Sequence, residues 1–252
     1  MVSDNLNRLY HEQRATYPEP FRLRIYRALS WLKRADVLLA DGFDELNHEL
    51  KTNTLHGKTR LSEIAWQALA KTEGDWDFAF VSLWIAFNAI YARDLNLKDS
   101  QDRVHLRDFL NTVCRLDERQ QIYQLVWRAF SSDVRVLLNN RYVFQPFWDF
   151  HNGLISQAAF EEDFQHNKQK ANAALAKQDT ESLLALVFNC LYTLRNQIIH
   201  GGATWQSSAN RKQIQSACTF LSKILPVFIS IMMNNPNHET WGKPFYPFVK
   251  ED

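Results

Sequence analysis

The chain has 252 residues, and its 29 Lys and Arg residues against 28 Asp and Glu residues give a formal net charge of +1. This length indicates one large domain or two small ones, and the even charge balance points to no nucleic acid, membrane or acidic partner overall, so any charged site must be local. Seven glycines are few against the roughly 17 that average usage predicts. Glycine-dependent nucleotide-binding α/β folds are therefore disfavoured, and the composition favours an all-α protein.

The cysteines and the apolar stretches indicate a cellular compartment. Cys114, Cys190 and Cys218 lie far apart without zinc-type spacing, which is typical of reduced thiols. The polar N-terminus lacks the apolar core of a signal peptide, and the longest apolar stretches fall short of about 20 residues. We therefore expect a cytoplasmic protein that does not engage a membrane.

The first helix is predicted from Pro20 to about Ala40, with the proline in its first turn. The segment before it is expected to be loosely structured. On a helical wheel its apolar arc holds Phe21, Ile25, Ala28, Leu29 and Leu32. The opposite face is cationic and holds Arg22, Arg27, Lys33 and Arg34. This face is interpreted either as an ordinary solvated surface or as a contact surface for an RNA backbone.

The middle of the chain contains further helical patterns. Residues 43 to 70 are predicted to be helical with an interruption near 52 to 58, and Asp75 is a candidate N-cap for a central helix that is apolar on nearly all sides. Two helices are expected over 103 to 115 and 118 to 139. Pro146 is expected to prevent a regular helix in the aromatic segment 141 to 153, whose rings would cover a core edge or a subunit contact.

Three elements complete the pattern. Residues 156 to 178 predict an exposed helix, and Asp179 or Thr180 can cap the next one, which should stop at Gly201 and Gly202. A last helix is expected from about 208 to 233. The division predicted from this pattern is a helical extension over 1 to 74 packed on the core, a bundle over 75 to 235, and an extended tail over 236 to 252.

One group of residues has side chains that are suited to catalysis. Arg195 is followed by four residues and then by His200, where the two glycines let the backbone leave helical geometry. An arginine can neutralise the charge that develops on a phosphorane, while a histidine near its titration point moves a proton. The alternative is structural, with Arg195 bonded to loop carbonyls and His200 capping the helix end.

The sequence from Arg195 through Asn196 to His200 and its following glycines, at the end of an apolar helix, resembles the signature of the HEPN superfamily. The segment FVSLWIAFNAIYA also resembles the first core helix of the Apea-like branch of that superfamily. The likeness covers about residues 75 to 235. It implies an all-α, HEPN-like helical bundle that forms a homodimer in which two such motifs face one cleft.

The resemblance also implies an activity. Many members are metal-independent endoribonucleases, often toxins or antiviral effectors, in which the ribose 2′-hydroxyl attacks the adjacent phosphate. By this resemblance Arg195 and His200 form the catalytic pair, Asn196 orients it, RNA is the substrate, no cofactor is needed, and an antitoxin protein is a candidate partner. In the branch paired with nucleotidyltransferase antitoxins a Tyr stands two residues after the His, where this chain has Gly202, so that particular pairing is not implied.

Two alternatives bear on this hypothesis. A noncatalytic helical module that binds RNA, a nucleotide or another protein would keep the same fold. Glu45 with His48, and Asp163 with His166, have the spacing of di-iron bundles, which also need inward carboxylates from two other helices that this sequence lacks. No metal site is therefore predicted.

Overall fold

The computed structural model describes residues 2–53, 75–92, 99–129, 131–208, 210–244 and 246, and over these ranges it is helical and contains no strand. The main helices are α1 (Val2–Gln13), α2 (Glu19–Asn53), α4 (Trp76–Tyr91), α5 (Asp99–Leu116), α7 (Ser131–Leu138), α8 (Gln145–His151), α9 (Gln157–Lys177), α10 (Thr180–Ile199) and α11 (Arg211–Asn234). The predicted all-α class is thus confirmed.

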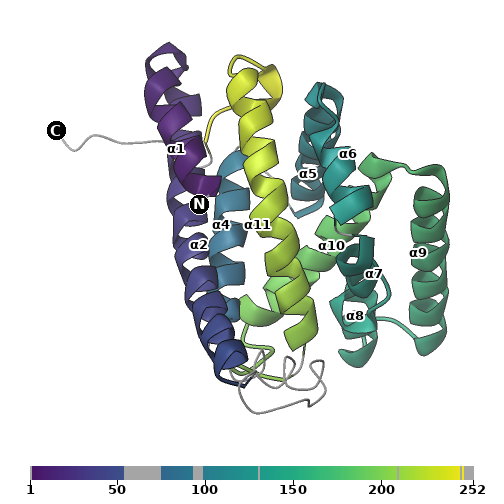
Figure 1. Ribbon diagram of the computed structural model, residues 1–252. Helices are drawn as coiled ribbons and strands as arrows, with labels where there is room; N and C mark the ends of the chain where they lie inside the picture. The colour runs from purple at the N-terminus through teal and green to yellow at the C-terminus, as the bar shows by residue number, and fades with distance from the viewer. Residues whose placement is uncertain are drawn as a thin grey trace.

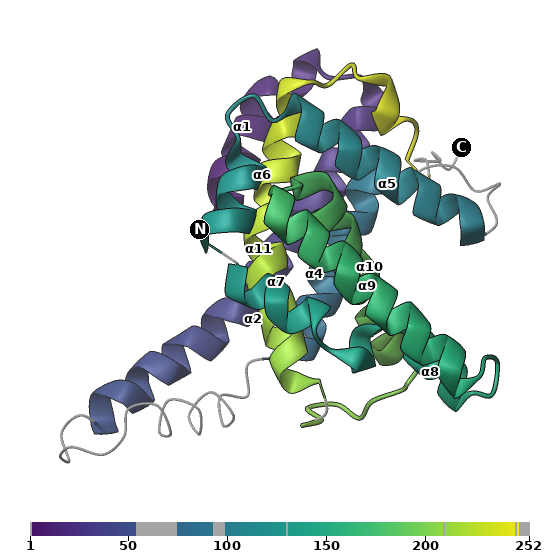
Figure 2. The same cartoon turned by 90° about the vertical axis from the view of Figure 1, so that its right-hand side faces the viewer.

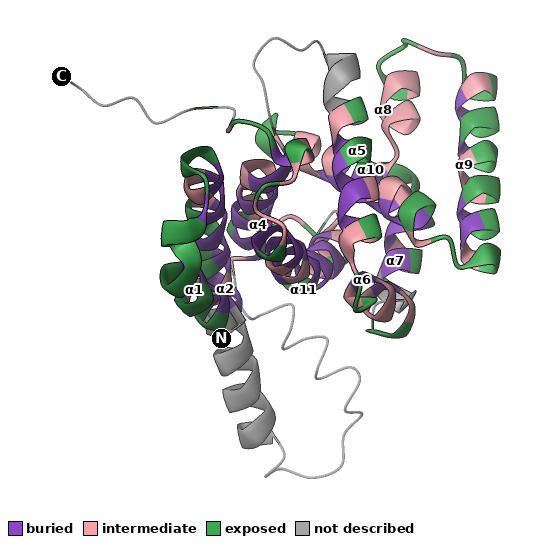
Figure 3. Ribbon diagram, turned by 90° about the horizontal axis from the view of Figure 1, so that it is seen from above, coloured by how far each residue is buried: buried purple, intermediate pink, exposed green. Residues whose placement is uncertain are grey.

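The core is centred on α2, α4 and α11, which lie side by side in Figure 1. The side chains of α4 and α11 that face the core are almost all buried, including Phe80, Phe87 and Phe228. Phe188 of α10 packs against Phe87, with ring centroids 4.5 Å apart and the rings tilted by 34°, and thereby joins α10 to this core. The apolar periodicity of residues 78 to 91, 183 to 198 and 218 to 231 predicts core positions there, and buried residues of α4, α10 and α11 do belong to the hydrophobic cluster, together with those of α2. Figure 3 shows the buried residues along these helices.

The opening segment is helical, so the expectation of a loosely structured N-terminus is wrong. The helix α1 and the short 3₁₀ turn η1 (Arg14–Thr16) precede α2. Leu6 and Tyr10 form a narrow apolar stripe that is buried against α2, and the hydroxyl of Tyr10 donates to the carbonyl of Arg22 at 3.1 Å. Leu6 and Tyr10 are the two apolar residues among the positions of α1 described as buried, and so thin a stripe did not stand out from a polar sequence.

The helix α2 begins with Pro20 at its second position and continues to Asn53, well beyond the predicted end at Ala40. The expected interruption near 52 to 58 falls at the helix end, and the rest of the predicted 43 to 70 segment lies outside the described residues. The buried residues of α1 and α2 belong to the same hydrophobic cluster as those of α4 and α11. In the described part, the N-terminal helices and the bundle therefore share one core.

Two expectations in the middle of the chain are corrected. The predicted helix over 118 to 139 is divided into α6 (Gln121–Gln124), the π-helical turn η3 (Leu125–Ala129) and α7. Pro146 does not prevent a helix: α8 is a regular helix with this proline in its first turn, where no backbone N–H is needed. The aromatic residues of α8 pack on α9, where Phe150 and Phe160 are stacked with centroids 6.0 Å apart.

The outer layer consists of α8 and α9 (Figure 2). The N-cap of α9 is Ser156, whose hydroxyl accepts from the backbone N–H of Ala159 at 3.2 Å. Four residues of α9 are buried, and the remainder is polar and mostly exposed, as the sequence predicted. Asp179 caps α10 by accepting from the backbone N–H of Ser182 at 3.0 Å, which selects Asp179 from the two predicted candidates.

The C-terminal segment is not simply extended, because it contains the 3₁₀ turn η5 (Glu239–Trp241) with Trp241 buried. Its backbone is fastened by Arg24, a completely buried arginine of α2. Arg24 donates to the carbonyl of Lys243 at 2.8 Å and to the carbonyls of Ala89 and Ala92, at the end of α4, at 2.9 and 3.0 Å. Arg24 thus ties together α2, the C-terminal end of α4 and the tail.

By length and hydropathy, α11 is the one helix of the described residues that could cross a membrane. In this structure, 72% of the apolar 18-residue stretch of α11 that could span a membrane is buried inside the protein. Core helices of soluble proteins share this length and composition.

Candidate functional site

The C-terminal end of α10 carries the predicted catalytic residues, and its geometry follows from the two glycines. The backbone N–H of Gly202 donates to the carbonyl of Gln197 at 2.7 Å, and that of Gly201 donates to the carbonyl of Ile198 at 3.2 Å. This pair of bonds is a Schellman motif, which requires a left-handed residue after the C-cap, and Gly201 has φ +72°. His200 is the C-cap and is exposed, so the turn places its ring at the surface.

Arg195 and Asn196 are directly bonded. Nη1 of Arg195 donates to Oδ1 of Asn196 at 2.9 Å, and both side chains are partly buried. The carbonyl of Asn196 also accepts from the backbone N–H of His200 at 3.0 Å. Asn196 therefore contacts Arg195 through its side chain and His200 through its backbone, and the three predicted catalytic residues lie together within the last two turns of α10.

Gln197 fastens this helix end to two other segments. Its Nε2 donates to the carbonyl of Tyr142, in the 3₁₀ turn η4 (Arg141–Val143), and its Oε1 accepts from Nδ2 of Asn210 at 2.6 Å. The turn before α8 and the start of α11 are thereby held against the residues that carry the motif. Gln197 was missed by the sequence analysis, although its place between Arg195 and His200 marked it as a residue of the same site.

The loop that follows His200 is anchored to the N-terminal end of α4. The indole N–H of Trp205 donates to Oδ1 of Asp75 at 3.4 Å, and the backbone N–H of Gln206 donates to Oδ2 of Asp77 at 3.2 Å. Arg211 completes the anchor with Nη2 at 3.0 Å from Oδ2 of Asp77. Asp75, predicted as the N-cap of α4, does accept from the backbone N–H of Phe78 at 3.3 Å, and it therefore serves both the helix and the loop.

The cations predicted on the outer face of α2 contact other parts of the protein than the motif, and two of them lie far from it. Arg22 and Arg27 lie on either side of Arg24 in the sequence, and Arg24 is bonded to the C-terminal end of α4. The loop after His200 is bonded to the N-terminal end of α4. Since α4 has 16 residues, its two ends are about 24 Å apart. Arg27 donates to the carbonyl of Tyr246, and Nζ of Lys33 lies 3.8 Å from a carboxylate oxygen of Asp4. Arg34 is exposed. The structure thus places Arg195, Asn196 and His200 together at one helix end and places Arg22 and Arg27 away from them.

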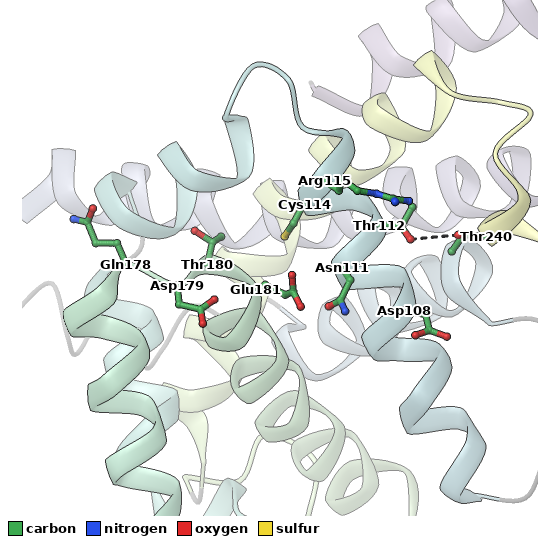
Figure 4. A pocket seen from close by; sticks show the side chains of 10 residues that line it. All are labelled: Asp108, Asn111, Thr112, Cys114, Arg115, Gln178, Asp179, Thr180, Glu181 and Thr240. Atoms are coloured by element: carbon green, nitrogen blue, oxygen red, sulfur yellow. Dashed lines mark hydrogen bonds between the residues drawn. The ribbon is translucent and has the colours of Figure 1, made fainter.

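A polar pocket of about 780 Å³ lies at the opposite end of α10, between that helix, α5 and η5 (Figure 4). Since α10 has 20 residues, this pocket is about 30 Å from His200. Its lining residues are Asp108, Asn111, Thr112, Cys114, Arg115, Gln178, Asp179, Thr180, Glu181 and Thr240. Sequence reasoning missed this pocket, because its residues come from three separate segments and share no spacing.

All three cysteine thiols have a raised pKa. Burial, and then the negative charges of Glu181, Asp117 and Asp179, raise the pKa of Cys114 to about 12. Cys190 and Cys218 are buried, and burial raises the pKa of each thiol as well. Over the part of the chain that the structure describes, no three His, Cys, Asp or Glu side chains gather closely enough to hold a metal ion.

Comparisons with protein-family models, with curated proteins and with solved structures found nothing that matches this chain.

Proposed function

We propose that the protein is a metal-independent endoribonuclease whose catalytic residues are Arg195 and His200. The observation that supports this proposal is the arrangement at the end of α10, where an arginine bonded to Asn196 stands five residues before an exposed histidine on a glycine turn. An exposed imidazole can reach a substrate, and a guanidinium bonded to a neighbouring amide is held in a defined orientation.

The proposed reaction is a transesterification within RNA. His200 takes the proton of a ribose 2′-hydroxyl, and the oxygen attacks the adjacent phosphorus. The bond from phosphorus to the 5′-oxygen breaks, that oxygen receives a proton, and the products end in a 2′,3′-cyclic phosphate and a 5′-hydroxyl. Arg195 stabilises the extra negative charge of the phosphorane.

A homodimer belongs to the same proposal. One arginine and one histidine make a sparse active site, and a two-fold axis would supply a second His200 so that one imidazole accepts a proton while the other donates one. We further propose a cytoplasmic role as a toxin or antiviral effector, with RNA as substrate and an antitoxin as a candidate protein partner. Light scattering at micromolar concentration should report the dimer, and a monomer would contradict this part of the proposal.

The activity is tested by incubating the purified protein with total RNA in EDTA. The wild type should cleave, and His200→Ala and Arg195→Ala should each lose at least about 10²-fold in rate, the usual loss of a transition-state donor. Because His200 is exposed at a helix end, His200→Ala should change the free energy of unfolding by at most about 1 kcal/mol. If His200→Ala keeps full activity, a noncatalytic module that binds RNA, a nucleotide or a protein becomes the better account.

A further inference from the structure

Two aromatic side chains stand exposed at the end of α10 that carries the motif. Trp205 is 65% exposed and lies five residues after His200. Tyr142 is 49% exposed, and its carbonyl accepts from Gln197, three residues before His200. They come from segments far apart in the sequence: Tyr142 is bonded to the helix end through its carbonyl, and Trp205 lies in the loop that follows His200.

Both rings belong to segments whose positions are fixed. The carbonyl of Tyr142 also accepts from the indole N–H of Trp148 at 2.8 Å, and the Tyr142 ring meets that of Phe147 edge to face with centroids 5.1 Å apart. The indole of Trp205 donates to Asp75, and the next residue is bonded to Asp77. Rings held in place before binding lose little conformational freedom when a ligand arrives, which favours affinity.

The surroundings of these rings combine exposed polar residues with two exposed apolar side chains, Ile199 beside His200 and Phe78, whose backbone N–H is bonded to the same Asp75 oxygen as Trp205. Gly201, Gly202, Thr204 and Gln206 are all exposed between His200 and the anchored end of the loop, and Arg141 beside Tyr142 is exposed as well. A subunit interface needs a continuous apolar centre, whereas a stacking site needs separate rings with cations nearby to meet phosphates. Arg141 supplies such a cation, and the proposed function brings an RNA strand to His200, so a nucleic-acid strand is the occupant that fits the two rings and this cation together.

We propose that Trp205 and Tyr142 stack on unpaired bases of the RNA strand that reaches Arg195 and His200, so that the substrate is single-stranded RNA. The inference rests on the proposed ribonuclease function. In an A-form duplex the faces of the bases are covered by their neighbours, and only unpaired nucleotides can offer a face to a protein ring. The two rings would thus select loops and single strands and would place a phosphate beside the catalytic pair.

The test measures binding separately from cleavage, with fluorescence anisotropy of a labelled RNA 12-mer on the His200→Ala protein in EDTA. The single strand should bind at least roughly tenfold more tightly than the same strand annealed to its complement. Trp205→Ala and Tyr142→Ala, each in this background, should weaken single-strand binding by roughly 5- to 100-fold, the range of base stacking on an aromatic ring. Trp205→Phe and Tyr142→Phe keep a ring and should retain most of the binding.

Tyr123→Ala is the matched control, since its hydroxyl is bonded to Gln178 at the other end of α10, and it should bind as the parent does. Single-strand binding that is unchanged in both alanine variants, or equal binding of duplex, would overturn the inference. A change of Trp205→Ala from dimer to monomer in light scattering would assign the ring to a subunit contact and would overturn it too. Wild-type protein that binds through Trp205 but does not cleave would refute the ribonuclease proposal and leave the stacking site standing.

Discussion

Arg211 and Asp77 form an ion pair with 3.0 Å between Nη2 and Oδ2, which joins the start of α11 to the first turn of α4. The same carboxylate oxygen accepts from the backbone N–H of Gln206, in the loop after His200. Both side chains are mostly buried, with 20% and 13% of their surfaces exposed. The pair therefore fixes a loop that leads directly from the proposed catalytic histidine.

Asp77→Ala should destabilise the protein and loosen this loop. Removing one partner of a mostly buried ion pair should cost about 1 to 3 kcal/mol, between the values for exposed and for buried pairs. Urea unfolding measures the cost, and hydrogen exchange should show faster exchange at Gln206. If exchange at Gln206 is unchanged while the fold is retained, the carboxylate does not hold the loop.

Arg24→Met should be among the most destabilising single changes in α2. It removes the charged donor to the carbonyls of Ala89, Ala92 and Lys243 and leaves these acceptors without that partner, at an expected cost of about 3 kcal/mol or more. Arg34→Met, at an exposed position of the same helix, is the control and should change stability by less than about 0.5 kcal/mol. Equal unfolding midpoints for the two variants would contradict the role given to Arg24.

The core helices could be predicted from the sequence, whereas the hydrogen-bond partners of Arg24 could not. The apolar periodicity of residues 78 to 91, 183 to 198 and 218 to 231 was wide enough to identify α4, α10 and α11 as core helices. Arg24 occupies the same arc as Phe21 and Ala28, so an arginine at a core position was a readable signal. Its three acceptors, however, lie 65 to 219 residues away, and no local pattern specifies them.

Some features of the candidate site could likewise be predicted from the sequence, and others could not. The Arg195 and His200 spacing and the glycine turn could be predicted, because they lie within eight consecutive residues whose backbone preferences are local. The contacts of Gln197 with Tyr142 and Asn210 could not, since they depend on how α8 and α11 pack. Pro146 was misjudged because a first-turn proline and a helix-breaking proline differ only in where the helix begins.

Asp179 should make stability depend on pH in the acid range. Hydrogen bonds from the side chain and the backbone N–H of Ser182 hold the pKa of Asp179 below its usual value of 3.8. The stabilisation is therefore complete above that usual value and is lost as the pH falls through the lower pKa of the folded state. Asp179→Asn keeps an N-cap acceptor without titrating, so the stability advantage of wild type over this variant should shrink between about pH 5 and pH 2.

Asp179→Ala separates capping from charge. It removes the acceptor altogether and should cost about 1 kcal/mol at neutral pH, as N-cap removal does elsewhere. Thermal or urea unfolding across the pH range measures both variants. A difference between wild type and Asp179→Asn that stays constant across this range would show that the carboxylate does not titrate with folding.

The salt dependence of RNA binding tests whether the cationic face of α2 contacts the RNA backbone. If Lys33 and Arg34 each neutralise one phosphate of a single strand, Lys33→Ala combined with Arg34→Ala should reduce the slope of log K against log salt by about 1.4, or about 0.7 per contact. Binding of the RNA 12-mer to the His200→Ala protein at a series of salt concentrations supplies this slope. An unchanged slope would identify this face as an ordinary solvated surface.

The central claim is that Arg195 and His200 direct a ribose 2′-hydroxyl against the adjacent phosphorus without a metal ion. The most direct test uses an RNA oligonucleotide cleaved at one bond and the same oligonucleotide with a single deoxyribose on the 5′ side of that bond, both in EDTA. The all-ribose strand should be cut to a 2′,3′-cyclic phosphate and a 5′-hydroxyl, as seen by mass spectrometry, and the substituted strand should stay intact at that bond. Cleavage of the substituted strand, or cleavage that His200→Ala performs equally well, would contradict the account.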